Sequence, residues 1–147
     1  MARKMEIEFS KGEKLVAELY DEEAPATCNY VWDRLPFTSP AKQNFMSGGN
    51  VEVYLYGWTF NKLEYANPGV PRDEIGLLSR WIPHSPENKP FCKILVGGTS
   101  EVHEFLSMPT PVNRFAKIVE GLDQLTVVRN RLTEEGTQGT NITFRKK

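Results

Sequence analysis

One stretch, from Leu15 to Pro36, constrains the fold most, because a strand pattern, an acidic corner and an amphipathic helix pattern follow one another directly. Leu15, Ala17 and Leu19 occupy alternate positions, the period of two that is typical of a strand with one buried face. Negative charge in the corner lies near the positive end of a following helix dipole. The corner consists of Asp21, Glu22 and Glu23.

The helix pattern begins at Pro25, which fits a first turn because its missing N–H would have no partner there in any case. An apolar stripe follows at the spacing i, i+3, i+4 and i+7, formed by Cys28, Val31, Trp32 and Leu35. Pro36 cannot continue a helix. The pattern therefore predicts a three-turn helix with one buried face.

The length of 147 residues is that of one domain, for which roughly 68–70% of the surface of the unfolded chain can be buried. A formal net charge of −1 gives no field that would attract nucleic acid or an anionic membrane. No segment approaches the roughly 20 apolar residues of a membrane span, and the N-terminus lacks the apolar core of a signal peptide. We expect one cytoplasmic domain over residues 1–147, without nucleic-acid or membrane partners.

Short strand patterns dominate the rest of the chain. The alternation from Met5 to Phe9 predicts a strand that forms a hairpin with the strand at Leu15. Further strands are expected over residues 51–60, 75–82, 91–96, 115–119 and 142–144. Residues 38–50 predict a loop with at most one short strand around Phe45 and Met46, and residues 101–106 fit either a strand or a turn. A weaker second helix pattern covers residues 121–131, with Leu122, Leu125, Val128 and Leu132 roughly on one side. The sum predicts a mainly β fold, a closed or nearly closed barrel capped by two helices.

An aromatic row occupies alternate positions of the strand expected over residues 51–60. Tyr54, Tyr56 and Trp58 would lie on one face of that strand, opposite its aliphatic residues. Such a row is more often covered by the core or by a second subunit, but aromatic walls with a few polar tips also line small-molecule sites. Trp81, at the end of the next strand pattern, is a further candidate for the wall.

Four segments in order resemble the cyclophilin family. They are the stretch LVAELYDEEAPATCNYVWDRL (15–35), Gly76-Leu77-Leu78-Ser79, the segment from Phe115 to Leu122, and Thr140 to Phe144. The resemblance implies a cyclophilin-like barrel over most of the chain. More specifically, the chain is similar to small bacterial proteins of unknown role that have such a barrel.

The segments that carry chemistry in cyclophilins depart from the family's pattern. The resemblance implies an arginine near the proline amide, with a Gln, a Trp, a His and several Phe around an apolar proline pocket. Here Pro40 stands where the arginine is expected, Val112 replaces the His and Ser107 the Trp, and the segment after Phe45 lacks the Gln. Phe45 alone is carried over as a site residue. We therefore lean against an enzyme, with peptidyl-prolyl isomerase as the first candidate if there is one.

Three polar residues remain as candidate ligand contacts. His84 and His103, the only histidines, lie beside turn segments but show no tight metal-binding pattern, so we expect no metal and no cofactor. Arg114 precedes the strand at Phe115 and could bind a carboxylate through two parallel hydrogen bonds, although an exposed arginine beside a loop is the commoner arrangement. Cys28 and Cys92 are expected to be reduced core residues.

The leading hypothesis is a barrel that binds a small molecule, such as a carboxylate, or a short peptide segment on its face. The expected site residues are Phe45, Tyr54, Tyr56, Trp58, Trp81, His84, His103 and Arg114. A divergent peptidyl-prolyl isomerase is one alternative. A homo-oligomeric assembly module, in which the aromatic row forms the interface, is another.

Overall fold

The computed structural model describes residues 2–43, 50–81, 90–98, 103–105, 108–109, 111–136 and 139–147, with the backbone alone at residues 80, 81, 90, 103–105, 108 and 109. Two helices occur in this part of the chain, α1 (Pro25–Trp32) and α2 (Leu122–Glu135). The strands are β1 (Lys4–Phe9), β2 (Lys14–Leu19), β3 (Phe37–Pro40), β4 (Lys42–Gln43), β5 (Val51–Tyr56), β6 (Ala66–Asn67), β7 (Glu74–Trp81), β8 (Pro90–Val96), β9 (His103–Phe105), β10 (Met108–Pro109), β11 (Val112–Glu120) and β12 (Asn141–Lys146).

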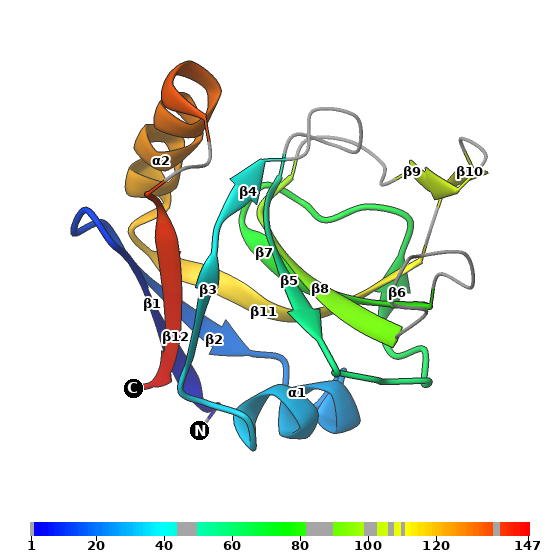
Figure 1. Cartoon of the computed structure of the whole chain (residues 1–147). Coiled ribbons are helices and arrows are strands. Elements are labelled where there is room, and N and C mark those ends of the chain that lie inside the picture. The colour runs from blue at the N-terminus through cyan, green and yellow to red at the C-terminus, as the bar shows by residue number, and fades with distance from the viewer. Residues whose placement is uncertain are drawn as a thin grey trace.

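The main sheet curls into a nearly closed antiparallel barrel (Figure 1). Its strand order among the described residues is β3-β12-β1-β2-β11-β7-β8-β5-β4, with β6 paired to β11, while β9 and β10 form a separate two-stranded sheet. The two edge strands, β3 and β4, are consecutive in the chain, and the Ser39 hydroxyl donates a hydrogen bond to the Tyr54 carbonyl of β5 at 3.4 Å. This contact spans the gap between the edges. The predicted barrel is confirmed.

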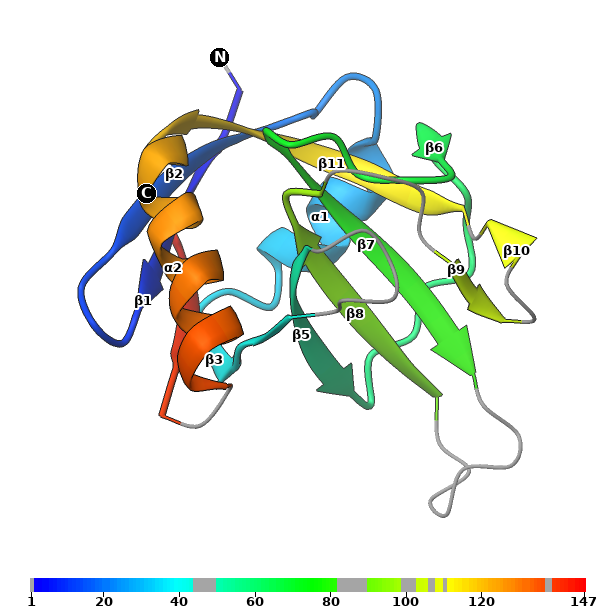
Figure 2. The same cartoon turned by 90° about the horizontal axis from the view of Figure 1, so that it is seen from above.

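Two helices pack against one continuous core from different ends of the barrel (Figures 1 and 2). Cys28 and Val31 of α1 are fully buried. The buried residues of α2 are Leu125, Val128 and Leu132, three of the four that the sequence placed on one side, and Leu122 is partly buried. Within the described residues no helix is long and apolar enough to cross a membrane.

The entry to α2 depends on a glycine. Gly121 has φ +85°, and a Cβ built on it would lie 2.2 Å from the Lys14 carbonyl oxygen. A side chain at this position would therefore collide with the backbone of β2. The close approach allows β11 to turn directly into α2 against the start of β2.

The beginning of α1 is stabilised from a distant segment rather than by the acidic corner. The first turn of α1 contains no acidic residue, and Asp21 instead forms an ion pair with Arg3 at 2.6 Å. The Glu64 carboxylate accepts hydrogen bonds from the backbone N–H groups of Ala26 (3.2 Å) and Thr27 (2.7 Å). It thereby satisfies donors that have no partner inside the helix.

Three predicted boundaries are wrong in detail. The helix α1 ends at Trp32, so the expected third turn up to Pro36 is absent. Strands β3 and β4 lie where a loop was expected, and the short strand expected around Phe45 and Met46 falls outside the described residues. The strand β5 ends at Tyr56, four residues earlier than predicted.

Candidate functional site

The outward side of β5 and β8 carries two of the aromatic residues that the sequence pointed to, Tyr54 and Tyr56. Val51, Val53 and Leu55 of β5 are buried in the barrel core, so the alternate residues of the strand face outward. The antiparallel register sets Tyr54 opposite Lys93 and Tyr56 opposite Phe91. We call this surface the β5–β8 face, defined by Glu52, Tyr54, Tyr56, Phe91, Lys93 and the neighbouring Lys42.

The three aromatic rings of the β5–β8 face contact one another. Tyr54 stacks on Phe91 with 5.6 Å between ring centroids, and Tyr56 lies 5.4 Å from Phe91 and 6.4 Å from Tyr54. Phe91 is 5% exposed, whereas Tyr56 is 60% exposed. The cluster thus has a buried base and an accessible tyrosine, an arrangement that can receive an apolar or aromatic group.

Two ammonium groups approach the Tyr54 ring. Lys42 Nζ lies 4.3 Å and Lys93 Nζ lies 4.7 Å from the ring centroid, within the range of cation–π contacts. Burial, followed by the charge of Glu52, raises the pKa of Tyr54. The phenol is therefore neutral at pH 7 and can donate a hydrogen bond.

The two lysines of this face differ in their pairing. Lys93 Nζ lies 3.6 Å from a Glu52 carboxylate oxygen, and both side chains are 3% exposed, so each ion neutralises the other in a dry environment. Lys42 is exposed, and among the described residues the structure shows no carboxylate partner for it. Lys42 is therefore the cation of this face that is accessible to an anionic ligand.

Trp58 does not belong to the β5–β8 face, contrary to the sequence prediction. The strand ends at Tyr56, and Gly57 (φ +88°) redirects the chain. The Trp58 ring packs 5.0 Å from Phe37 and 5.7 Å from Tyr30 of α1. It therefore contributes to the packing between α1 and the barrel.

Arg114 is also placed away from the tyrosines. Its strand, β11, is separated from β5 by β7 and β8. The guanidinium lies 3.4 Å from a carboxylate oxygen of Glu74, donates from Nε to the Tyr65 carbonyl at 3.3 Å, and covers the Tyr65 ring at 3.9 Å. These contacts already use its charge and two of its donor nitrogens, Nε and Nη1.

The remaining predicted site residues are placed only in part. Phe45 and His84 lie outside the described residues. Trp81 is the last residue of β7, opposite Pro90, and His103 is the first of β9; for both, the backbone alone is described. Val112, at the position expected for the family's histidine, is fully buried.

Sequence analysis missed Lys42, Phe91 and Lys93, which complete the face. A signal was present, because Lys93 interrupts the apolar run Phe91 to Val96. A lysine inside a short buried strand needs a partner. The partner, Glu52, lies on the strand whose aromatic pattern had already been noted.

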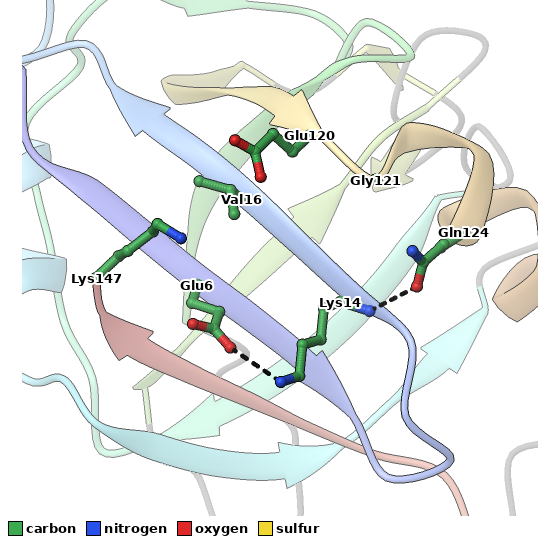
Figure 3. Close-up of a pocket in the computed structure, with 7 residues that line it drawn as sticks. All are labelled: Glu6, Lys14, Val16, Glu120, Gly121, Gln124 and Lys147. Carbon is green, nitrogen blue, oxygen red and sulfur yellow. Dashed lines mark hydrogen bonds and ion pairs between the residues drawn. The ribbon is translucent and has the colours of Figure 1, made fainter.

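Elsewhere, residues within the described ranges line two surface hollows. The first, of about 350 Å³, is formed on the outside of β1 and β2 and is lined by Glu6, Lys14, Val16, Glu120, Gly121, Gln124 and Lys147 (Figure 3). Within it Lys14 Nζ lies 3.8 Å from Glu6, and the Lys14 backbone N–H donates to Gln124 at 2.9 Å. The second, of about 460 Å³, follows the acidic corner before α1.

Neither hollow offers both an accessible aromatic surface and an accessible cation, as the β5–β8 face does. The first is lined by no aromatic residue, and its Lys14 pairs with Glu6; the second is lined mainly by carboxylates and by no Lys or Arg. Within the described part of the chain, no group of three or more His, Cys, Asp or Glu residues is arranged to hold a metal ion. The β5–β8 face is the candidate site that combines accessible aromatic surface with an accessible cation.

Comparison with solved structures identifies the fold. Neither a protein-family model nor a curated protein matches the chain. The structure of McbB in complex with tryptophan is 18% identical with a TM-score of 0.69, covering 97% of this chain; this chain spans only 44% of McbB.

Two further similar structures are close in size to this chain. A cyclophilin-type peptidyl-prolyl cis-trans isomerase from Cryptosporidium parvum is 14% identical with a TM-score of 0.57, covering 100% of this chain and 98% of that one. A hypothetical protein from Archaeoglobus fulgidus is 20% identical with a TM-score of 0.57, covering 99% and 95%. The protein therefore has a cyclophilin-like fold.

Proposed function

We propose that this protein binds a small carboxylate-bearing molecule, or the end of a short peptide segment, on the β5–β8 face. The observation that carries the proposal is the contact of accessible Tyr56 with Tyr54 and buried Phe91, beside the exposed ammonium of Lys42. The rings would pack against an apolar group, and Lys42 would pair with the carboxylate. Lys42 takes the role that the sequence suggested for Arg114, because Glu74 already neutralises the Arg114 guanidinium.

The related structures motivate the choice of ligands. McbB was solved in complex with tryptophan, and the Cryptosporidium isomerase was also solved in the presence of the dipeptide Ala-Pro. Both molecules combine an apolar or aromatic group with a free carboxylate. This is the combination that Tyr56 and Lys42 can recognise together.

The experiment is calorimetric titration with L-tryptophan and with Ala-Pro, each compared with its amide, in which a neutral carboxamide replaces the carboxylate. We expect the free acids to bind at least about tenfold more tightly than the amides, which corresponds to about 1.4 kcal/mol. Lys42→Gln should abolish this difference, and Tyr56→Ala should weaken both forms. Tyr65→Ala is the matched control, because Tyr65 is 42% exposed but contacts Arg114 and Tyr20 instead.

Two results would contradict the proposal. One is unchanged affinity in both Tyr56→Ala and Lys42→Gln. The other is a dimer of the wild-type protein in light scattering that dissociates in Tyr56→Ala, which would assign the face to assembly of two copies. A protease-coupled proline-peptide assay, run in parallel, tests whether bound peptide is also isomerised.

A further inference from the structure

Arg129 of α2 has two buried guanidinium nitrogens without a partner among the described residues. Its Nε and Nη2 atoms are inaccessible to solvent and have no hydrogen-bond acceptor among the described residues. Leaving a buried donor unsatisfied destabilises the folded state, and more so when the group is charged. A guanidinium in this state indicates that an acceptor belongs at the site.

The same helix provides a direct comparison. Arg131, two residues further on, donates to both carboxylate oxygens of Glu13, at 2.7 and 2.9 Å. Although its Nε is also without a partner, its charge is neutralised by this bidentate pair. Arg129 has no corresponding carboxylate among the described residues.

The guanidinium of Arg129 lies against the end of β8. A Cβ built on Gly97, whose φ is +66°, would lie 3.0 Å from Arg129 Nη2 and 2.9 Å from both Leu125 Cδ2 and the Arg72 carbonyl oxygen. Any side chain at position 97 would displace these neighbours. The glycine therefore brings α2, the turn before β7 and the end of β8 together at one point.

Asn50 contributes a second unpartnered group at the same rim. It is 1% exposed, and neither its Oδ1 nor its Nδ2 has a partner in the described part of the chain. Because Val51 pairs with Val96 in the antiparallel ladder, the next positions outward, Asn50 and Gly97, lie across from one another. The backbone register thus places the unpartnered Asn50 amide, which can donate through Nδ2, opposite the glycine that Arg129 Nη2 approaches.

Arg72 adds a second positive charge. The Arg72 carbonyl oxygen lies beside Gly97, at the point that Arg129 Nη2 also approaches. Burial lowers the pKa of Arg129, and the charge of Arg72 lowers it further. Arg72 itself is exposed at the turn before β7. Two neighbouring guanidinium groups are stabilised when an anion lies between them.

From this geometry we propose that an oxyanion, a carboxylate or a phosphate group, binds at the barrel rim between α2 and Gly97. Arg129 donates through Nε and Nη2, Asn50 donates through its amide, and Arg72 supplies the second charge from the solvent side. This site is independent of the β5–β8 face, since it uses none of the residues on which the proposed function depends.

The experiment measures thermal unfolding in sodium phosphate and in sodium acetate, each against sodium chloride at the same ionic strength. We expect at least one oxyanion to raise Tm by about 3 °C once it exceeds its Kd tenfold. The larger of the two shifts distinguishes a phosphate site from a carboxylate site. Equal Tm values in all three salts would overturn the proposal.

Three variants locate the effect. Arg129→Gln should abolish the shift without lowering the basal Tm, because it removes a buried unpaired charge. Asn50→Asp should reduce the shift, because it places a carboxylate at the rim. Arg131→Gln, the matched control on the same helix, should lower the basal Tm but keep the shift; if it fails to fold, Glu13→Gln replaces it.

Retention of the full oxyanion shift in Arg129→Gln would overturn the proposal, as would its loss in the control variant. Lys42→Gln and Tyr56→Ala should keep the full shift. The proposed function and this inference can therefore fail separately.

Discussion

Replacing Glu64 by glutamine tests how α1 is held against the barrel. The carboxylate is buried and accepts three hydrogen bonds, from the backbone N–H groups of Ala26 and Thr27 and from the Thr27 hydroxyl at 2.8 Å. Its own backbone N–H donates to Asn113 at 3.0 Å. Glutamine keeps the shape and one acceptor oxygen but turns an amide N–H₂ toward a backbone donor.

The expected loss follows from these contacts. At least one charge-assisted hydrogen bond disappears, which lowers the free energy of unfolding by about 2 kcal/mol and Tm by about 4–8 °C for a chain of this size. The ion pair with Lys62, at 3.4 Å and with the lysine 64% exposed, adds little because solvent screens it. Glu135→Gln is the control, since its ion pair with Lys11 is exposed on both sides.

The effect depends on pH with a defined sign. Burial acts to raise the pKa of Glu64, but hydrogen bonds from Thr27 and Ala26 outweigh this effect and hold the pKa below its ordinary value of 4.5. The stabilisation is therefore complete above about pH 4.5 and is lost as the pH falls through the lower pKa of the folded state. The difference between wild type and Glu64→Gln should shrink over that interval.

Urea unfolding followed by circular dichroism measures the difference at pH 7 and at successively lower pH. Other depressed carboxyl groups titrate in the same interval, but they are common to both proteins and cancel in the difference. A loss below about 0.5 kcal/mol at pH 7, within the usual range for surface substitutions, would refute the reasoning. A difference that stays constant down to the lowest pH at which both proteins fold would also refute it.

Two further predictions concern the backbone and the thiols. Gly121→Ala should destabilise the protein by about 3 kcal/mol and Gly12→Ala by about 1 kcal/mol. Both glycines have positive φ, but of the two only Gly121 would place a Cβ against backbone atoms. Thermal unfolding measures both losses of stability, and equal losses would contradict the steric argument. Burial raises the pKa of Cys28 to about 12 and also raises that of Cys92. Iodoacetamide at pH 8 should therefore modify both thiols only after unfolding, and rapid labelling of the native protein would contradict this.

Local patterns predicted the fold because the barrel is built from them. Alternation identified the hairpin of β1 and β2, and the buried stripe of α2 falls on the residues that the spacing indicated. The closing strands β3 and β4 were missed because their residues Phe37–Pro40 and Lys42–Gln43 show no apolar alternation. They pair through backbone groups, and that pairing depends on partners distant in the chain.

The candidate site was predicted less completely for a similar reason. Tyr54 and Tyr56 follow the period of a strand, but the same period continues in the sequence past Gly57, where the backbone turns. Trp58 was assigned to the face on that continuation. The partner of Arg114, Glu74, lies 40 residues away in sequence, and no local pattern indicates such a pair.

Both proposed sites lie outside the barrel, and its packing explains why. Phe9, Phe115 and Phe144 are among the side chains that fill the interior and are almost completely inaccessible to solvent, so a ligand inside would have to displace the core. Near the proposed sites, polar side chains are buried at Asn50, which directly precedes β5 at the rim, and at Glu52 on the outward face of β5.

The strand β5 connects the two places, and its register with β8 positions both. Tyr54 opposite Lys93 forms the aromatic face, and Val51 opposite Val96 brings Asn50 to Gly97. A shift of one residue would exchange the inward and outward sides of β5 and remove both sites together. Lys42 and Arg129 lie on other elements, β4 and α2, so variants at these two positions change one site at a time while leaving the shared strand intact.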